Sequence, residues 1–315
     1  MKFNGPMPAT DDPEAAKNLE AIYGHPQERW AALIGRVGDN DLQLFVDVQD
    51  EWLAYLWTLD AYRKAEVVPR GMGNPDTQPG DRLAAEYRKK GNYYADLLTA
   101  LLSNRTEQKL APRTKVKGFS QNHQIDVAWP DRDSKPLIDP LICLETKVTG
   151  APAYGKTKAR GAMSDWSNRR KELKFAATDL KLFRRGLTTK IDGWDSWRKD
   201  QLPYCFFIWG ARLSQRDKVA KMVSEVQALT KTYLDGAGVF AWKENEDGTA
   251  YEAVDITERD LSDRVTTVDE ILREIGSHVD KLAPKGKIPA PVVPEPEEQA
   301  VDTAELAEDT KSASD

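Results

Sequence analysis

Residues 124–147 read QIDVAWPDRDSKPLIDPLICLETK and contain two strand-like apolar runs. Side chains alternate between the two faces of a strand, so each run is expected to have one face that packs in a core. In the first run the predicted apolar face is Ile125, Val127 and Trp129, and the opposite face is Gln124, Asp126 and Ala128.

The second run ends in an acid-x-Lys pattern. Ile142, Leu144 and Val148 are expected to face the core, with Thr146 on the same side, whereas Glu145 and Lys147 point the other way. Two neighbouring strands would therefore bring Asp126, Glu145 and Lys147 together at one edge of a sheet.

Metal-assisted hydrolysis of a phosphodiester is the chemistry that suits this trio. Two carboxylates supply the hard oxygen ligands that Mg²⁺ prefers, and bound Mg²⁺ lowers the pKa of a water molecule. Lys147 would orient that water or offset the charge that develops on the phosphate. We therefore predict Asp126 and Glu145 as metal ligands and Lys147 as the third catalytic group.

These residues resemble the PD-(D/E)xK nuclease superfamily, and in particular type II restriction endonucleases. Asp126 matches the first acid, with Ile125 where the signature often has Pro, and Glu145 and Lys147 match the second half. A predicted helix (82–103) and a basic strand (113–119) precede the Asp strand, which is the order found in the superfamily. Over residues 81–213 the resemblance implies an α/β (α+β) fold with a mixed sheet flanked by helices, and Mg²⁺-dependent DNA cleavage.

The superfamily often has a further acid on its first helix that assists metal binding. Asp96 and Glu86 lie on the predicted helix 82–103, and either would match that position. For both residues a surface carboxylate is the competing interpretation.

A second motif overlaps the predicted site. Gly150 to Thr157 reads GAPAYGKT and satisfies GxxxxGK[ST], the loop that holds phosphates in nucleotide-binding proteins. The preceding strand ends in Glu145 and Lys147, whereas a buried parallel strand that feeds such a loop is usually apolar throughout. The apolar strand predicted at 204–209 also ends without the acid that such proteins place there. A P-loop-type nucleotide-binding protein is therefore kept as an alternative function.

The net charge is −6, but two segments of the chain are strongly basic. Residues 82–117 contain 9 Lys and Arg against 3 acids, and a further basic excess runs from Lys156 to Lys199. DNA binding needs local rather than global positive charge. A basic helix is predicted at 159–185, with a solvated helix face as the competing interpretation. The predicted DNA-binding residues are Lys156, Lys158, Arg160, Arg169, Arg170, Lys171 and Lys174.

Three parts are predicted along the chain. Residues 1–80 have a helical pattern, 81–283 carry the nuclease-like pattern with its basic helix, and 284–315 form a Pro-rich, acidic tail that is expected to be disordered. No run of about eighteen apolar residues occurs, and the only two cysteines lie in apolar runs. A cytoplasmic protein without a membrane segment is expected.

The sequence thus predicts a Mg²⁺-dependent endonuclease that cuts double-stranded DNA at a specific site. A homodimer is expected because a two-fold axis suits palindromic sites, and a restriction enzyme needs a DNA methyltransferase, encoded nearby, to protect its host. The alternatives are a repair, recombination or phage-defence nuclease without strict sequence specificity, and a DNA-binding protein that does not cut.

Overall fold

A computed structural model describes residues 5–8, 13–68, 70–72, 76, 85, 87, 89–154, 156–187, 202–214, 217–256, 261 and 264–283. In this part of the chain the helices are α1 (Pro13–Tyr23), α2 (Pro26–Asp39), the short 3-10 helix η1 (Phe45–Asp47), α3 (Gln49–Lys64), α5 (Lys90–Thr106), α6 (Trp166–Leu187), α8 (Val219–Thr230) and α9 (Val268–Leu282). The strands are β1 (Ala111–Lys117), β2 (Asn122–Trp129), β3 (Ile142–Thr149), β4 (Tyr204–Arg212), β5 (Gly236–Glu244), β6 (Tyr251–Ala253) and β7 (Val265–Thr267). The predicted tail, 284–315, lies outside the described residues.

The described strands form one mixed sheet of seven strands in the order β1-β2-β3-β4-β5-β6, with β7 also paired to β5. β1, β2 and β3 form an antiparallel meander. β4 runs parallel to β3, β5 runs parallel to β4, and β7 runs parallel to β5. The predicted mixed α/β class and mixed sheet flanked by helices are confirmed.

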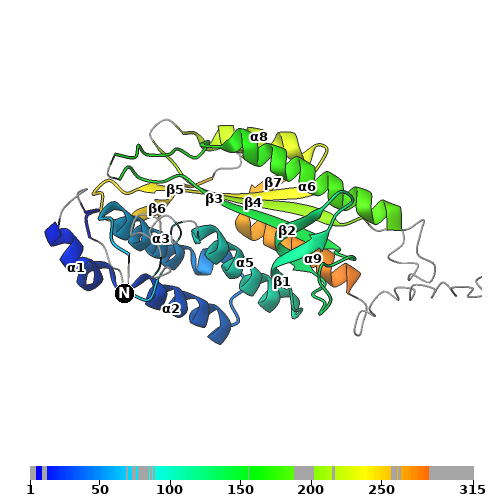
Figure 1. Cartoon of the computed structure of the whole chain (residues 1–315), viewed down its shortest axis with the longest axis horizontal. Helices are drawn as coiled ribbons and strands as arrows, with labels where there is room; N and C mark the ends of the chain where they lie inside the picture. The colour runs from blue at the N-terminus through cyan, green and yellow to red at the C-terminus, as the bar shows by residue number, and fades with distance from the viewer. Residues whose placement is uncertain are drawn as a thin grey trace, which may run out of the picture.

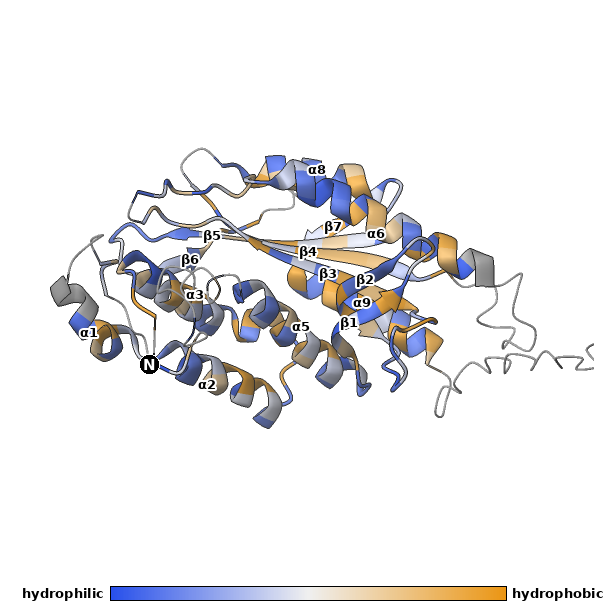
Figure 2. Cartoon of the chain, viewed as in Figure 1, coloured by the Kyte–Doolittle hydropathy of each residue, from blue (hydrophilic) through white to orange (hydrophobic). Residues whose placement is uncertain are grey.

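Helices cover both faces of the sheet. In Figure 1 α6 and α8 lie on one face, and α2, α3, α5 and α9 lie on the other. β4 alternates accordingly, because Phe206 and Ile208 pack in one core cluster whereas Phe207 and Trp209 pack in the other. Figure 2 shows apolar residues in the central strands and both hydrophilic and apolar residues along the helices that flank them. Burial on both faces explains why this strand reads as a continuous apolar run.

The N-terminal helices share a core with the sheet. Trp52 and Trp57 of α3 are fully buried in the same cluster as Leu97 of α5 and Trp242 of β5. A buried polar contact adds to this packing, since the Tyr251 hydroxyl donates to Asp60 of α3 at 2.5 Å. The region 1–80, which was predicted as a helical segment, therefore forms part of the same packed body in its described residues.

The prediction for the faces of β2 is wrong at Ile125. Val127 and Trp129 pack in the cluster on the α5 side, but Ile125 packs with Ala128 in the cluster on the α6 side. The physical reason is that the pairing of β1 with β2 lapses at Arg113 and Asp126, between Pro112↔Val127 and Thr114↔Ile125, without a shift in register, and that Arg113 has a φ of 41°. Such a local irregularity bends a strand and changes which face its side chains meet.

Candidate active site

Asp126 lies where β2 and β3 part. These strands pair only over Val127↔Leu144, Ala128↔Cys143 and Trp129↔Ile142, so Asp126 is the first residue of β2 beyond the paired segment. Its Oδ2 accepts hydrogen bonds from the backbone N–H of Thr146 at 2.8 Å and from the Thr146 hydroxyl at 2.9 Å. The carboxylate is therefore held against Thr146, the residue of β3 that lies between Glu145 and Lys147 in the sequence.

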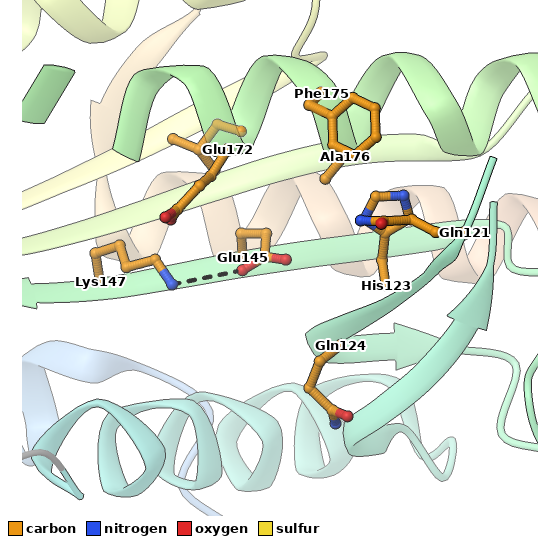
Figure 3. Close-up of a pocket in the computed structure, with 9 residues that line it drawn as sticks. Gln121, His123, Gln124, Glu145, Lys147, Glu172, Phe175 and Ala176 are labelled. Carbon is orange, nitrogen blue, oxygen red and sulfur yellow. Dashed lines mark ion pairs between the residues drawn. The ribbon is translucent and has the colours of Figure 1, made fainter. Parts of the chain in front are cut away.

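Glu145 and Lys147 share one face of β3, as predicted. Lys147 Nζ lies 3.8 Å from Glu145 Oε2, and the side chains are 30% and 18% exposed. Figure 3 shows both side chains below α6, with the ion pair drawn between them. The opposite face of β3 carries Leu144, which is fully buried on the α5 side. The alternation of β3 thus places Glu145 and Lys147 on the opposite face from the core cluster on the α5 side.

Burial and negative neighbours raise the pKa of Glu145 to about 8 from its ordinary value of 4.5. Desolvation is the largest cause, the charge of Asp126 is the next, and Glu172 adds to it, whereas Lys147 acts in the opposite direction. A strongly perturbed carboxyl group with a specific charge partner is a feature of functional sites. A nearby positive charge would stabilise the ionised form of this carboxyl group.

The pKa of Glu145 predicts how stability depends on pH. Between about pH 4.5 and 8 the folded state keeps a proton that the unfolded state has lost, so stability falls as the pH rises through this window. Glu145→Gln has no such proton, and we expect it to flatten this decline and to stabilise the protein at pH 9 by on the order of a few kcal/mol. Urea unfolding in EDTA from pH 5 to pH 9 measures the effect. Exposed Glu252→Gln is the control, and parallel curves for wild type and Glu145→Gln would contradict the assignment.

A pocket of about 210 Å³ opens beside Glu145 and Lys147 between α6 and the strands. Its lining residues are Gln121, His123, Gln124, Glu145, Lys147, Glu172, Leu173, Phe175 and Ala176. Asp126, whose carboxylate is held against Thr146, is not among them. The pocket is therefore lined by two carboxyl groups, one ammonium group and two aromatic rings, those of His123 and Phe175.

Glu172 is a member of this site that the sequence did not reveal. It lies on α6, and Figure 3 shows its carboxylate pointing from the helix toward Glu145 and Lys147. It also pairs with Arg169, one turn earlier, at 2.7 Å. Its sequence context is an ordinary i,i+3 pair on a charged helix, so no local signal distinguishes it from a solvated acid.

Asp96 is engaged elsewhere in this structure. It lies on α5, is partly exposed, and pairs with Arg113 of β1. The other acid proposed for this role, Glu86, lies outside the described residues. Among the described residues no three His, Cys, Asp or Glu side chains are grouped closely enough to hold a metal ion in the present arrangement. The role of Asp96 as an assisting ligand stays a prediction.

His123 forms a buried polar anchor rather than a surface contact. It is 8% exposed, and its Nε2 lies 2.8 Å from Asp179 Oδ2 on α6. The other Asp179 oxygen accepts from the backbone N–H of Ser120 at 2.9 Å and from the Ser120 hydroxyl at 2.8 Å. Burial alone would raise the pKa of Asp179, but the hydrogen bonds from His123 and Ser120 outweigh it and lower that pKa. The turn between β1 and β2 is thereby fixed to α6 at one end of the pocket.

The predicted basic helix is α6, which begins at Trp166 rather than at Ala159. Several of its charges are paired within the protein. Arg169 pairs with Asp165 and Glu172, Arg170 pairs with Glu225 at 3.3 Å, and Lys174 lies over the Tyr233 ring at 4.9 Å. Lys171 is exposed, as are Lys156, Lys158 and Arg160 in the segment that precedes the helix. The three residues before the helix therefore offer the more accessible positive charge.

This difference predicts two salt dependences for DNA affinity. Changing Lys156, Lys158 and Arg160 together to Gln should lower affinity and flatten the plot of log affinity against log salt concentration by up to about 0.9 per lost phosphate contact. The matched change of Arg169, Arg170 and Lys171 should have a smaller effect, because two of these residues are already paired with acids. Titrations of a labelled duplex over a series of salt concentrations measure both slopes, and unchanged slopes for both variants would place DNA elsewhere.

The segment Gly150–Thr157 does not run directly into a helix. Tyr154 and Thr157 exchange two backbone hydrogen bonds, at 3.1 and 2.8 Å, and so do Ala151 and Arg160, at 3.0 and 2.9 Å. These N–H groups are occupied by carbonyl oxygens, and α6 begins only at Trp166. Gly150 has a φ of 83° and lies against the backbone of Arg212. These two features explain why this residue is glycine, and a bound phosphate is not needed to explain it. A phosphate-binding loop requires free backbone N–H groups at a helix start, so this geometry counts against nucleotide binding.

Comparison of the chain with protein-family models, curated proteins and solved structures found no match. Among the described residues there is also no helix with the length and apolar character needed to cross a membrane. The function is therefore inferred from the residues of the site and from their arrangement.

Proposed function

We propose that this protein is a Mg²⁺-dependent DNA endonuclease whose active site is formed by Asp126, Glu145 and Lys147. The observation that carries the proposal is that the Asp126 carboxylate is bound to Thr146 of β3, the neighbour of Glu145 in sequence, and that Lys147 pairs with Glu145 where β2 and β3 part. The chain order of α5, the antiparallel meander β1–β3, α6 and the parallel strand β4 supports a restriction-endonuclease-like core.

The donor set fits a hard divalent cation. Asp126 and Glu145 would hold Mg²⁺, because both offer carboxylate oxygens, and the charge of Asp126 is, after desolvation, a cause of the raised pKa of Glu145. When bound, Mg²⁺ supplies a water molecule of lowered pKa and polarises the phosphate. Thr146 fixes the orientation of the Asp126 carboxylate through two hydrogen bonds.

Lys147 would be the group that acts on the attacking water. Its ammonium lies beside Glu145 and is 30% exposed, so it is accessible to a substrate in the pocket. There it can donate hydrogen bonds to a water or to a phosphate oxygen and offset the negative charge of the transition state. The scissile bond is hydrolysed by water, so no residue of the chain needs to act as a covalent nucleophile.

Incubation of the purified protein with a mixed-sequence plasmid and Mg²⁺ tests this function. Discrete fragments would support a type II restriction enzyme, which is our first expectation together with a homodimer and a cognate methyltransferase. A smear would support the repair, recombination or phage-defence alternative. Binding of the plasmid without cleavage would contradict the proposal and favour a DNA-binding protein that does not cut.

A further inference from the structure

Hydrogen bonds join two walls of the pocket beside Glu145, the β1–β2 turn and α6. Asp179 fixes the β1–β2 turn to α6 through Ser120 and His123, and the backbone N–H of Phe119 also donates to the Asp179 carbonyl at 3.1 Å. A side chain at Gly118 would collide with the Asp179 carboxylate, so the turn and the helix are in close contact. The pocket is thus held open between two elements that are tied together.

An aromatic side chain is exposed at this pocket. Phe175 of α6 lines it and is 48% exposed, and its ring meets the ring of His123 at 5.4 Å with an angle of 62°. Phe119, on the anchored turn, is 66% exposed. Exposed rings on a rigid surface offer flat apolar area to a ligand at little cost in conformational entropy. Figure 3 shows Phe175 and Gln121 around the same end of the pocket.

The charges in the pocket favour a neutral ligand group with N–H donors. The carboxylate of Glu172 faces the pocket next to Glu145, so a phosphate there would meet an acidic side chain unless a cation accompanied it. A nucleobase is neutral, carries N–H donors, and has a flat face for Phe175. The exposed amide of Gln121 can both donate to and accept from a base edge. Charge and shape therefore match a base better than a backbone phosphate.

We propose that this pocket receives one unpaired base of the DNA strand next to the scissile phosphate, with Phe175 stacked on the base and Gln121 at its edge. This inference rests on the nuclease function proposed above and names the class of substrate for the same site. Glu145 is recessed between α6 and β3 and is 18% exposed, so a strand that has left the duplex reaches it more readily than a paired one. Substrates with an unpaired nucleotide avoid the cost of breaking a pair and are preferred.

The test uses one labelled oligonucleotide in three forms, namely single-stranded, fully paired, and paired except for one central unpaired nucleotide. Binding is measured by fluorescence anisotropy in EDTA, and cleavage is measured with Mg²⁺. The variants of the full chain are Phe175→Ala, Phe175→Tyr, which keeps the flat ring, and Leu182→Ala as a control. Leu182 is matched because it lies on the same helix and is 45% exposed, but it does not line this pocket.

We expect wild type to bind and cleave the two forms with unpaired nucleotides in preference to the paired form. Phe175→Ala should weaken binding to those two forms by about 5- to 150-fold, the range for loss of one base–aromatic stack. Phe175→Tyr should bind these two forms as tightly as wild type, and so should Leu182→Ala. A 2-aminopurine at the unpaired position should lose fluorescence on binding wild type and regain it with Phe175→Ala.

The outcomes separate this inference from the nuclease function. Cleavage of all three forms at equal rates, with no effect of Phe175→Ala, would overturn the base pocket and leave the nuclease proposal standing. Binding that depends on Phe175, without cleavage in Mg²⁺, would support the base pocket and contradict the nuclease proposal. Loss of binding in both Phe175→Ala and Phe175→Tyr would also overturn the stacking role, because the ring is retained in the second variant.

Discussion

Lys147→Ala is expected to reduce the rate of DNA cleavage by about 100- to 1000-fold, the cost of removing one preorganised group that stabilises a transition state. DNA affinity should change little, because Lys147 is a single, partly buried charge beside Glu145 rather than part of the exposed basic segment. Single-turnover cleavage in Mg²⁺ and duplex binding in EDTA measure the two quantities separately.

Lys156→Ala is the matched control for this variant. It removes one charge of the same type from the exposed segment after β3, where the backbone forms a small hairpin instead of a phosphate-binding loop. Cleavage should therefore persist, with a modest loss of affinity. Full cleavage by Lys147→Ala, or loss of an ATP- or GTP-dependent activity in Lys156→Ala, would invert the assignment in favour of nucleotide binding.

Asp179→Ala is expected to destabilise the fold by roughly 3 kcal/mol. The change removes the acceptor for the Ser120 hydroxyl, the Ser120 N–H and His123, and each buried donor left without a partner costs about 1–3 kcal/mol. Asp179→Asn keeps one acceptor oxygen and should therefore lose less stability than Asp179→Ala. Guanidinium unfolding of both variants measures the effect.

Glu252→Ala serves as the control for Asp179→Ala. Glu252 forms a surface pair with Lys243 in which both side chains are about half exposed, at 43% and 53%, and such pairs contribute little to stability. If Asp179→Ala lowered the free energy of unfolding no more than Glu252→Ala, the anchor between the β1–β2 turn and α6 would not stabilise the fold.

Periodicity predicted the central strands well, because strong alternation and apolar runs are local signals. The faces of β3 follow from Leu144 and Glu145 alone, and β4 contains the apolar strand predicted at 204–209. The three-residue strand β7 was missed, since so short a segment carries no period. Ile125 was assigned to the wrong face because the irregularity at Arg113, in the partner strand, leaves no trace in the sequence of β2.

The polar contacts of the site depended on tertiary structure. The pairing of His123 with Asp179 joins residues 56 positions apart, and sequence spacing gives no sign of it. The same is true of Glu172, which reaches Glu145 only because α6 crosses above β3. Thr146 was predicted on the same face of β3 as Leu144, but its hydrogen bonds to Asp126 appear only when β2 and β3 are placed together.

The most direct test of the central claim compares plasmid cleavage by wild type and Glu145→Gln, purified in parallel, with Mg²⁺ and with EDTA. Glu145→Gln preserves the size of the side chain and removes the charged oxygen that would bind the cation. We predict cleavage by wild type in Mg²⁺ only, and none by Glu145→Gln although it is folded and binds DNA. Equal cleavage by both proteins, or wild-type cleavage that persists in EDTA, would contradict an active site built on Asp126, Glu145 and Lys147.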